Sequence, residues 1–220
     1  MKRTLSAFRS RGPALAQMYA LLTAQIAAAA FIVKKSRGSD SARKLCKPAA
    51  FFANFVLGLV ALISMYAFRE VLGTGGQVAL LCVLTVLMAL QLQCLTGKFS
   101  EERITHALVT VAQIFLSMTV TALVLAMLGV DVSFLGIALF FGFILLLLWG
   151  IVLMIWPGSR KLWTTYLFVG CILFSLSILS NTHDFLTNTE DPPTVPEAAM
   201  GLYIDLVGLF QKVLILDGDN

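Results

Sequence analysis

The run SFLGIALFFGFILLLLWGIVLMIW, from Ser133 to Trp156, decides the fold class of this chain. It contains no charged residue, and it is longer than the roughly 20 apolar residues that a helix needs to cross a bilayer. The whole chain of 220 residues is 59% hydrophobic and 13% charged. An ordinary soluble domain has about 25% charged residues. The sequence therefore predicts an all-α integral membrane protein whose surroundings are a lipid bilayer.

Apolar runs of similar length recur along the chain and are separated by short connections. On this basis we expect seven transmembrane helices, near residues 14–33, 49–68, 77–95, 107–128, 133–156, 162–180 and 198–216. The connections are expected to include a turn over Arg69–Gly76 and a longer loop over Asn181–Glu197. Short connections make neighbouring helices antiparallel, so a single transmembrane bundle over residues 1–220 is expected.

The distribution of Lys and Arg indicates an orientation in the membrane. Seven crossings would put the N-terminus and the basic segment Lys34–Lys47 on opposite sides, with five Lys and Arg residues on the N-terminal side and eleven on the other. Because cytoplasmic loops carry an excess of Lys and Arg, the count favours a cytosolic first loop and a non-cytosolic N-terminus. The six basic residues of that loop are also expected to attract anionic lipid head groups.

Several classes of function are disfavoured by what the sequence lacks. The basic residues cluster around the first run, so they indicate membrane insertion, and nucleic acid is not an expected partner. No metalloprotease, serine-hydrolase or P-loop motif is present, so we expect no enzymatic activity. The cysteines Cys46, Cys82, Cys94 and Cys171 form no C-x-x-C pair. They indicate neither a metal site nor a disulfide framework, so we expect packing residues and no cofactor.

Polar side chains are rare inside the apolar runs. Most are uncharged, such as Gln91, Gln93 and Thr119, and residues of this kind usually make hydrogen bonds between helices. Asp205 differs because it is ionisable and lies in the middle of the last run. Ionisable residues at such a position usually belong to ion paths or proton relays. We therefore expect Asp205 to face the bundle interior, on a segment that either crosses the membrane or re-enters it.

Four segments carry motifs that together resemble a known family. They are Arg11–Gly12 with Met18–Gln25, then Val130–Phe134, Gly170–Leu176 and Gly201–Phe210. They resemble the first-helix pattern, the signal before the fifth helix, the sixth-helix Gly-x-x-Leu-Phe-Ser-Leu and the closing Leu-Tyr-x-Asp-x-x-x-Leu-Phe of the Bax inhibitor or lifeguard family. The last motif is the most specific, and the resemblance runs along most of the chain.

The resemblance implies a seven-helix bundle with the last helix at its centre. It also implies a pH-sensitive leak, with calcium as the permeant ion, across an internal or bacterial membrane. In eukaryotes and their viruses it further implies restraint of cell death and contact with other membrane proteins of cell-death pathways. The expected location is then the endoplasmic reticulum or Golgi, and in a bacterium the inner membrane.

In that family two aspartates, one ending the sixth helix and one in the last helix, form a hydrogen-bonded pair that senses protons. Asp205 matches the second aspartate, but Asn181 occupies the first position. An amide forms hydrogen bonds but does not ionise, so the coupled titration of two carboxylates is expected to be lost. Asp184 could replace the missing acid if the sixth helix continued one turn, but we expect the loop to begin at Thr182.

The sequence departs from the family pattern elsewhere too. The second run has no internal Arg of the kind that some relatives place against the aspartate pair. A divergent copy captured by a large DNA virus would fit these losses. His183 beside Asp184, together with Gln91, Gln93 and Thr119, completes the set of auxiliary site residues that the sequence suggests.

Two interpretations of function follow. The first is a calcium-permeable leak with Asp205 as its essential acid and Asn181 as the hydrogen-bond partner of Asp205. The second is a membrane-embedded interaction protein that regulates cell death or host membrane proteins, in which conduction was lost with the first aspartate.

Overall fold

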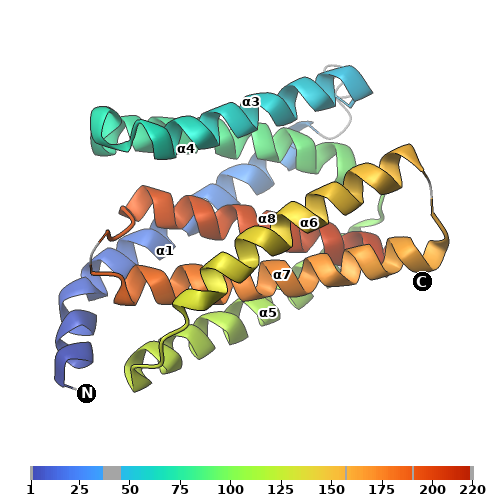
Figure 1. Cartoon of the computed structure of the whole chain (residues 1–220). Coiled ribbons are helices and arrows are strands. Elements are labelled where there is room, and N and C mark those ends of the chain that lie inside the picture. Colours follow the sequence, from blue (N-terminus) through green and yellow to red (C-terminus); the bar gives the residue numbers. More distant parts are fainter. Residues whose placement is uncertain (1, 37–45, 157, 190, 219–220) are drawn as a thin grey trace. The chain divides into compact units, whose positions relative to one another are not determined.

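The computed structural model of the chain describes residues 2–36, 46–156, 158–189 and 191–218. All regular structure in these ranges is helical (Figure 1). The helices are α1 (Lys2–Ser36), α3 (Pro48–Ala67), α4 (Arg69–Thr96), α5 (Glu101–Leu128), α6 (Ser133–Ile155), α7 (Arg160–Thr187) and α8 (Val195–Gly218). The prediction of an all-α protein is thus confirmed for the described part of the chain.

Six of the described helices are long and apolar enough to cross a membrane. The helix outside this group is α3, whose apolar stretch Phe52–Ala67 is shorter. Large apolar side chains on α6, such as Phe140 and Leu145, are exposed. Exposed apolar side chains in this density are suited to lipid and unsuited to water. The chain is therefore a multi-pass membrane protein, while the seven-helix bundle with a central last helix stays a prediction.

Two predicted connections are wrong. The turn expected over Arg69–Gly76 is helical except at Gly73, where φ of 55° and ψ of −178° break α4. The loop expected from Asn181 begins only after Thr187, because α7 continues through this stretch. The side chains of His183 and Phe185 are buried there. Packing of these side chains favours further helix, although hydropathy alone indicates a loop.

The chain divides into two compact units, each made of separate stretches of sequence. The first contains residues 1–12, 101–192 and 204–220, and the second contains residues 13–100 and 193–203. In the first unit, α7 packs against both α5 and α6. Ala122, Val132 and Leu179 form a buried cluster between these elements. The expectation of one domain over residues 1–220 stays a prediction.

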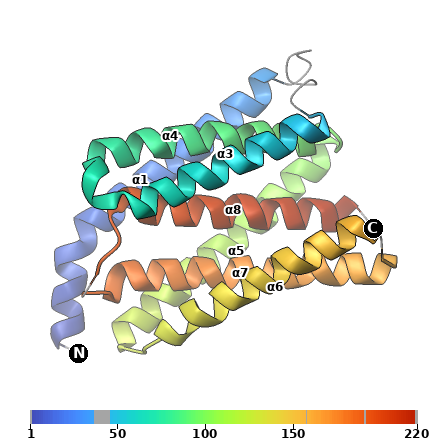
Figure 2. The ribbon, with the colours of Figure 1, turned by 45° about the horizontal axis from the view of Figure 1, so that its top comes forward.

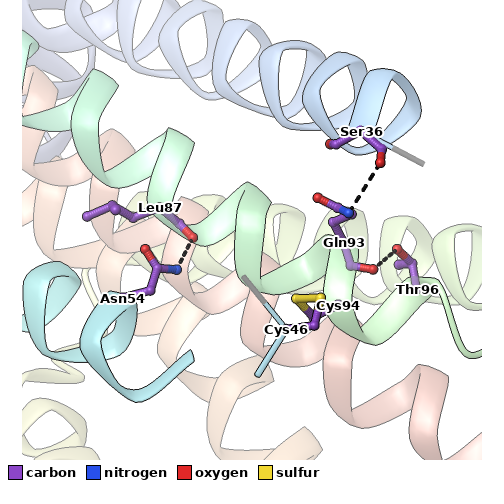
Figure 3. The surroundings of a disulfide bond; sticks show 7 residues. All are labelled: Ser36, Cys46, Asn54, Leu87, Gln93, Cys94 and Thr96. Carbon is purple, nitrogen blue, oxygen red and sulfur yellow. Dashed lines mark hydrogen bonds between the residues drawn. A yellow bond between two sulfur atoms is a disulfide. The ribbon is translucent and has the colours of Figure 1, made fainter. Parts of the chain in front are cut away.

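In the second unit, α3 and α4 pack side by side as a helical hairpin (Figure 2). Asn54 on α3 donates a hydrogen bond to the Leu87 carbonyl on α4, with a distance of 2.9 Å. At the open end of the hairpin, a disulfide joins Cys46 to Cys94, as Figure 3 shows. The prediction that these two cysteines are packing residues outside any disulfide is therefore wrong.

The disulfide was missed because the cysteines are 48 residues apart. Spacing along the sequence reveals pairs such as C-x-x-C, whereas this pair is brought together by the hairpin. Cys46 lies just before α3 and Cys94 lies in the last turn of α4, so antiparallel packing of the two helices makes them neighbours. Cys82 and Cys171 are free thiols.

The start of α8 is fixed by a capping box. The Glu197 side chain accepts a hydrogen bond from the Thr194 backbone N–H at 2.8 Å, and the Thr194 hydroxyl oxygen lies 3.4 Å from the Glu197 backbone nitrogen that donates to it. The Thr194 hydroxyl also donates to the Gln77 side chain on α4 at 2.7 Å. The buried Glu197 carboxylate lies 3.6 Å from the Arg69 guanidinium. Such reciprocal bonds satisfy N–H groups that a helix start leaves without partners.

The break in α4 predicts a difference between two nearby glycines. Gly73→Ala should lower the free energy of unfolding by about 1–3 kcal/mol, because its φ and ψ lie in a region that only glycine adopts readily. Gly75→Ala is the control, because this glycine is helical and an added Cβ would meet open space. Midpoints of heat-induced unfolding in detergent would test this, and equal midpoints for both variants would contradict it.

Candidate functional site

The last helix carries a buried carboxylate that is hydrogen-bonded to an amide on α7. The Asn181 Nδ2 atom donates to Oδ2 of Asp205 at a distance of 2.7 Å. Asp205 is only 4% exposed. The structure therefore brings together the two residues that the sequence proposed as partners, within the first unit.

Ser177 completes this cluster. It precedes Asn181 by four residues on α7, so the two side chains lie on the same face of the helix. The Asn181 Nδ2 atom lies 3.3 Å from the Ser177 hydroxyl oxygen, and Ser177 also hydrogen-bonds Asp205. Ser177 was not predicted from the sequence, because a single Ser in an apolar run usually makes an ordinary hydrogen bond between helices. The i, i+4 spacing from Asn181 was the signal that could have identified it.

Close packing of α7 against α8 sets the register of this cluster. A Cβ added to Gly208 would lie 2.5 Å from ring atoms of Phe174, so only glycine fits beneath this ring. Gly208 is three residues after Asp205, and Phe174 is three residues before Ser177. Because the helices are antiparallel, the contact between Phe174 and Gly208 places Asp205 opposite the polar end of α7.

A further contact along the same two helices involves Lys212. The Lys212 Nζ atom donates to the Tyr166 hydroxyl at 2.9 Å and lies 4.0 Å from the centre of the Tyr166 ring. The Lys212 stem packs over Gly170, where an added Cβ would lie 3.1 Å from Cε. The positive charge is thus held by an aromatic ring and a hydroxyl.

Two adjoining hollows lead toward the amide of the pair. The smaller, of about 230 Å³, is lined by residues that include Asn181 and Ser180. The larger, of about 580 Å³, is lined by residues that include Asp131 and Asn188. Ser133, His183 and Asp184 line both hollows. The hollows therefore share a polar wall at the end of α7 and the connection between α5 and α6.

His183 forms part of this shared wall and joins α7 to the connection between α5 and α6. Its Nε2 atom lies 2.9 Å from the Val130 carbonyl oxygen, and Nδ1 lies 3.2 Å from the Thr187 hydroxyl. A ring nitrogen beside a carbonyl oxygen must carry the proton to form a hydrogen bond. His183 is 4% exposed, and its hydrogen bond to Val130 links the connection between α5 and α6 to α7.

Two carboxylates lie by the larger hollow. Asp131 accepts hydrogen bonds from the backbone N–H of Ser133 at 2.9 Å and from the Ser133 hydroxyl at 2.5 Å. These bonds hold the pKa of Asp131 below its usual value, so this carboxylate is ionised at neutral pH. Asp184 is exposed on α7 and hydrogen-bonds the Asn188 side chain. The hollow is thus bordered by the ionised Asp131 carboxylate and by the Asp184 carboxyl group.

Asp184 was considered as a replacement for the missing acid beside Asp205. The helix does continue past Asp184, contrary to expectation, but Asn181 forms the hydrogen bond to Asp205. Asp184 lines the hollows.

The other auxiliary residues lie elsewhere along the chain. Gln93 on α4 donates to the Ser36 carbonyl oxygen at 3.4 Å, and Gln91 lies half-buried on the same helix in the second unit. Thr119 is buried on α5, and its hydroxyl has no hydrogen-bond partner within the described ranges. A part for these residues in an ion path stays a prediction. No cluster of three or more His, Cys, Asp or Glu suited to a metal ion occurs in the described residues.

The contact between α7 and α8 predicts the effect of a single methyl group. Gly208→Ala should lower the free energy of unfolding by about 1–3 kcal/mol, because overpacking displaces the Phe174 ring. Gly136→Ala is the matched control, because an added Cβ meets nothing there.

The double variant Gly208→Ala/Phe174→Leu should regain part of the loss, because the smaller side chain makes room for the new methyl group. Unfolding midpoints of the purified protein in detergent would measure both effects. Equal midpoints for Gly208→Ala and Gly136→Ala would contradict the packing argument.

Comparison with known proteins fits this geometry. A search of curated proteins finds no match to the chain. A family model described as "Inhibitor of apoptosis-promoting Bax1" matches residues 13–219, which include α1 from Pro13, every later described helix and both members of the Asp205–Asn181 pair. Because this match covers nearly the whole chain, the protein belongs to the Bax inhibitor family.

Proposed function

We propose that this protein is a multi-pass membrane leak for cations, with calcium as the physiological ion, and that it modulates calcium stores and so restrains cell death. The observation that supports this most strongly is the buried Asp205 carboxylate, on a helix long and apolar enough to cross a membrane, paired with Asn181. No enzymatic step forms part of the proposal.

The cost of placing a carboxylate in the membrane supports a functional role. An acid at the centre of a transmembrane helix costs at least about 2.5 kcal/mol on insertion. An apolar residue at position 205 would avoid this cost. Ser177 and Asn181 would then have no buried acid with which to form hydrogen bonds. A carboxylate at this position is expected if it interacts with ions or protons during function.

The adjoining hollows support an approach for ions. Their walls carry carboxylate, hydroxyl and amide groups, and oxygen atoms of these kinds are the ligands that Ca²⁺ takes in proteins. Asp131 and Asp184 at the larger hollow would raise the local concentration of cations. The smaller hollow reaches Asn181, which is one hydrogen bond from Asp205.

The amide partner determines the proton response that we expect. Two carboxylates that share a proton lose their protons in two coupled steps, whereas a carboxylate beside an amide has a single titration. In this chain the partner is Asn181, so the leak should have a weaker or displaced pH dependence. A proton response as steep as that of two coupled acids would contradict the assignment.

Loss of the first acid also supports a second candidate function. If conduction requires two acids, the chain would act as an interaction protein that regulates cell death or other membrane proteins. This alternative predicts that Asp205→Asn leaves protection from cell death intact, while neutralising the basic loop at positions 34–47 abolishes it. The leak proposal predicts that Asp205→Asn abolishes protection.

Calcium efflux from proteoliposomes that contain the purified protein tests the leak directly. Asp205→Asn should lower the efflux rate about tenfold, which corresponds to a barrier increase of about 1.4 kcal/mol. Asp217→Asn makes the same chemical change near the end of the same helix and should leave the rate near that of the unaltered protein. Absence of efflux from the unaltered protein would refute the leak.

The pH dependence provides a separate test of the pair. Asn181→Asp should add a second, coupled titration to the efflux profile between about pH 5 and 8, because two carboxylates then compete for one proton. The same substitution combined with Asp205→Asn should restore a single titration. An unchanged profile in Asn181→Asp would show that the pair does not control the leak.

A further inference from the structure

The disulfide closes the α3–α4 hairpin at the end where the two helices would otherwise separate. Cys46 precedes the first residue of α3, and Cys94 is two residues before the end of α4. At the other end, Phe68 alone connects the helices. The hairpin is therefore covalently linked at both ends. Each of the two helices spans the distance between these two links.

The two tied helices match in length. After the break at Gly73, α4 runs from Thr74 to Thr96, which is about 34 Å at 1.5 Å per residue. Helix α3 runs from Pro48 to Ala67, which is about 30 Å. The hydrocarbon core of a bilayer is also about 30 Å thick. If α4 crosses the membrane, α3 must return across it, although its apolar stretch is shorter than those of the other helices.

The outer surface of α3 agrees with a crossing. Phe52, Leu57, Val60, Ile63 and Tyr66 are all more than half exposed along its length. Apolar side chains spread over the whole helix fit lipid on that face.

The chemistry of the bond indicates which side of the membrane it faces. Joining the two thiols removes two electrons and two protons, which pass to an oxidant such as the disulfide of a thiol–disulfide oxidoreductase. Such oxidants act in the lumen of the secretory pathway and in the bacterial periplasm, while the cytosol keeps thiols reduced. We propose that the Cys46–Cys94 disulfide lies on the non-cytosolic face, that α3 crosses the membrane, and that the N-terminus is cytosolic.

The position of the N-terminus follows from α1. The Gln93 side chain donates to the carbonyl oxygen of Ser36, the last residue of α1. Gln93 is next to Cys94, so α1 ends beside the disulfide (Figure 3). Since α1 is long and apolar enough to cross, its first residues lie on the opposite face.

This orientation is the reverse of the one that the count of Lys and Arg favours. The count places eleven basic residues with the disulfide and five with the N-terminus. The positive-inside rule describes a bias, to which natural sequences make exceptions. A stable structural disulfide instead requires an oxidant where it forms, and the cytosol keeps thiols reduced. The chemical requirement outweighs the bias.

Counting accessible thiols in the full-length chain tests the bond itself. A maleimide carrying a polymer of fixed mass, added in denaturant without reductant, should add two tags to the unaltered protein, at Cys82 and Cys171. After reduction it should add four. Cys94→Ser should accept three tags with or without reductant, because Cys46 is then free. Four tags without reductant would refute the disulfide.

The membrane face is tested in sealed vesicles whose cytosolic face is outward. The variant Cys82→Ser/Cys171→Ser keeps only the bonded pair, which is first reduced with a membrane-permeant reductant. A membrane-impermeant maleimide should then react only after the vesicles are permeabilised. Reaction in intact vesicles would place the pair on the cytosolic face and overturn the orientation.

The crossing of α3 is tested by one added thiol at the other end of the hairpin. Glu70→Cys, in a chain whose four native cysteines are replaced by Ser, should react in intact vesicles, because this exposed position is predicted to be cytosolic. The matched chain that keeps only Cys46 should require permeabilisation. Reaction of both from the same side would show that α3 does not cross.

Discussion

The contact between the Phe174 ring and Gly208 fixes the register of α7 against α8, and the polar cluster depends on it. In this register the Asp205 carboxylate faces Ser177 and Asn181. A shift of one helical turn would place the carboxylate opposite the Phe174 ring, without a hydrogen-bond donor. An unpaired acid at bilayer depth costs several kcal/mol, so the polar pair and the close apolar contact reinforce the same register.

The long apolar runs predicted the helices correctly, because the need to satisfy backbone groups in lipid leaves little choice of structure. The ends of helices were less predictable. The turn near Gly73 and the end of α7 depend on packing that hydropathy does not describe. The disulfide was hidden for a similar reason, since Cys46 and Cys94 meet only through the hairpin.

The candidate site was predictable in part. Asp205 was identifiable because an acid in an apolar run is rare, and Asn181 followed from the family resemblance. Ser177 and the hollows bordered by Asp131 were not identifiable, because they depend on which faces of α5, α6 and α7 meet. The sequence identifies an ionisable residue in an apolar run well, but it does not identify the uncharged polar residues that form hydrogen bonds to it.

The surroundings of Asp205 on its own helix place no fixed positive charge beside its carboxylate. The nearest cation along the same helix is Lys212, seven residues away, which corresponds to a rise of about 10 Å. At an effective dielectric constant of 20, two unit charges at that distance attract by only about 1.7 kcal/mol. The Lys212 ammonium is instead held by Tyr166. Asn181 and Ser177 stabilise the carboxylate without adding a fixed positive charge. Asp205 is therefore held by uncharged hydrogen-bonding groups and not by an ion pair on its own helix.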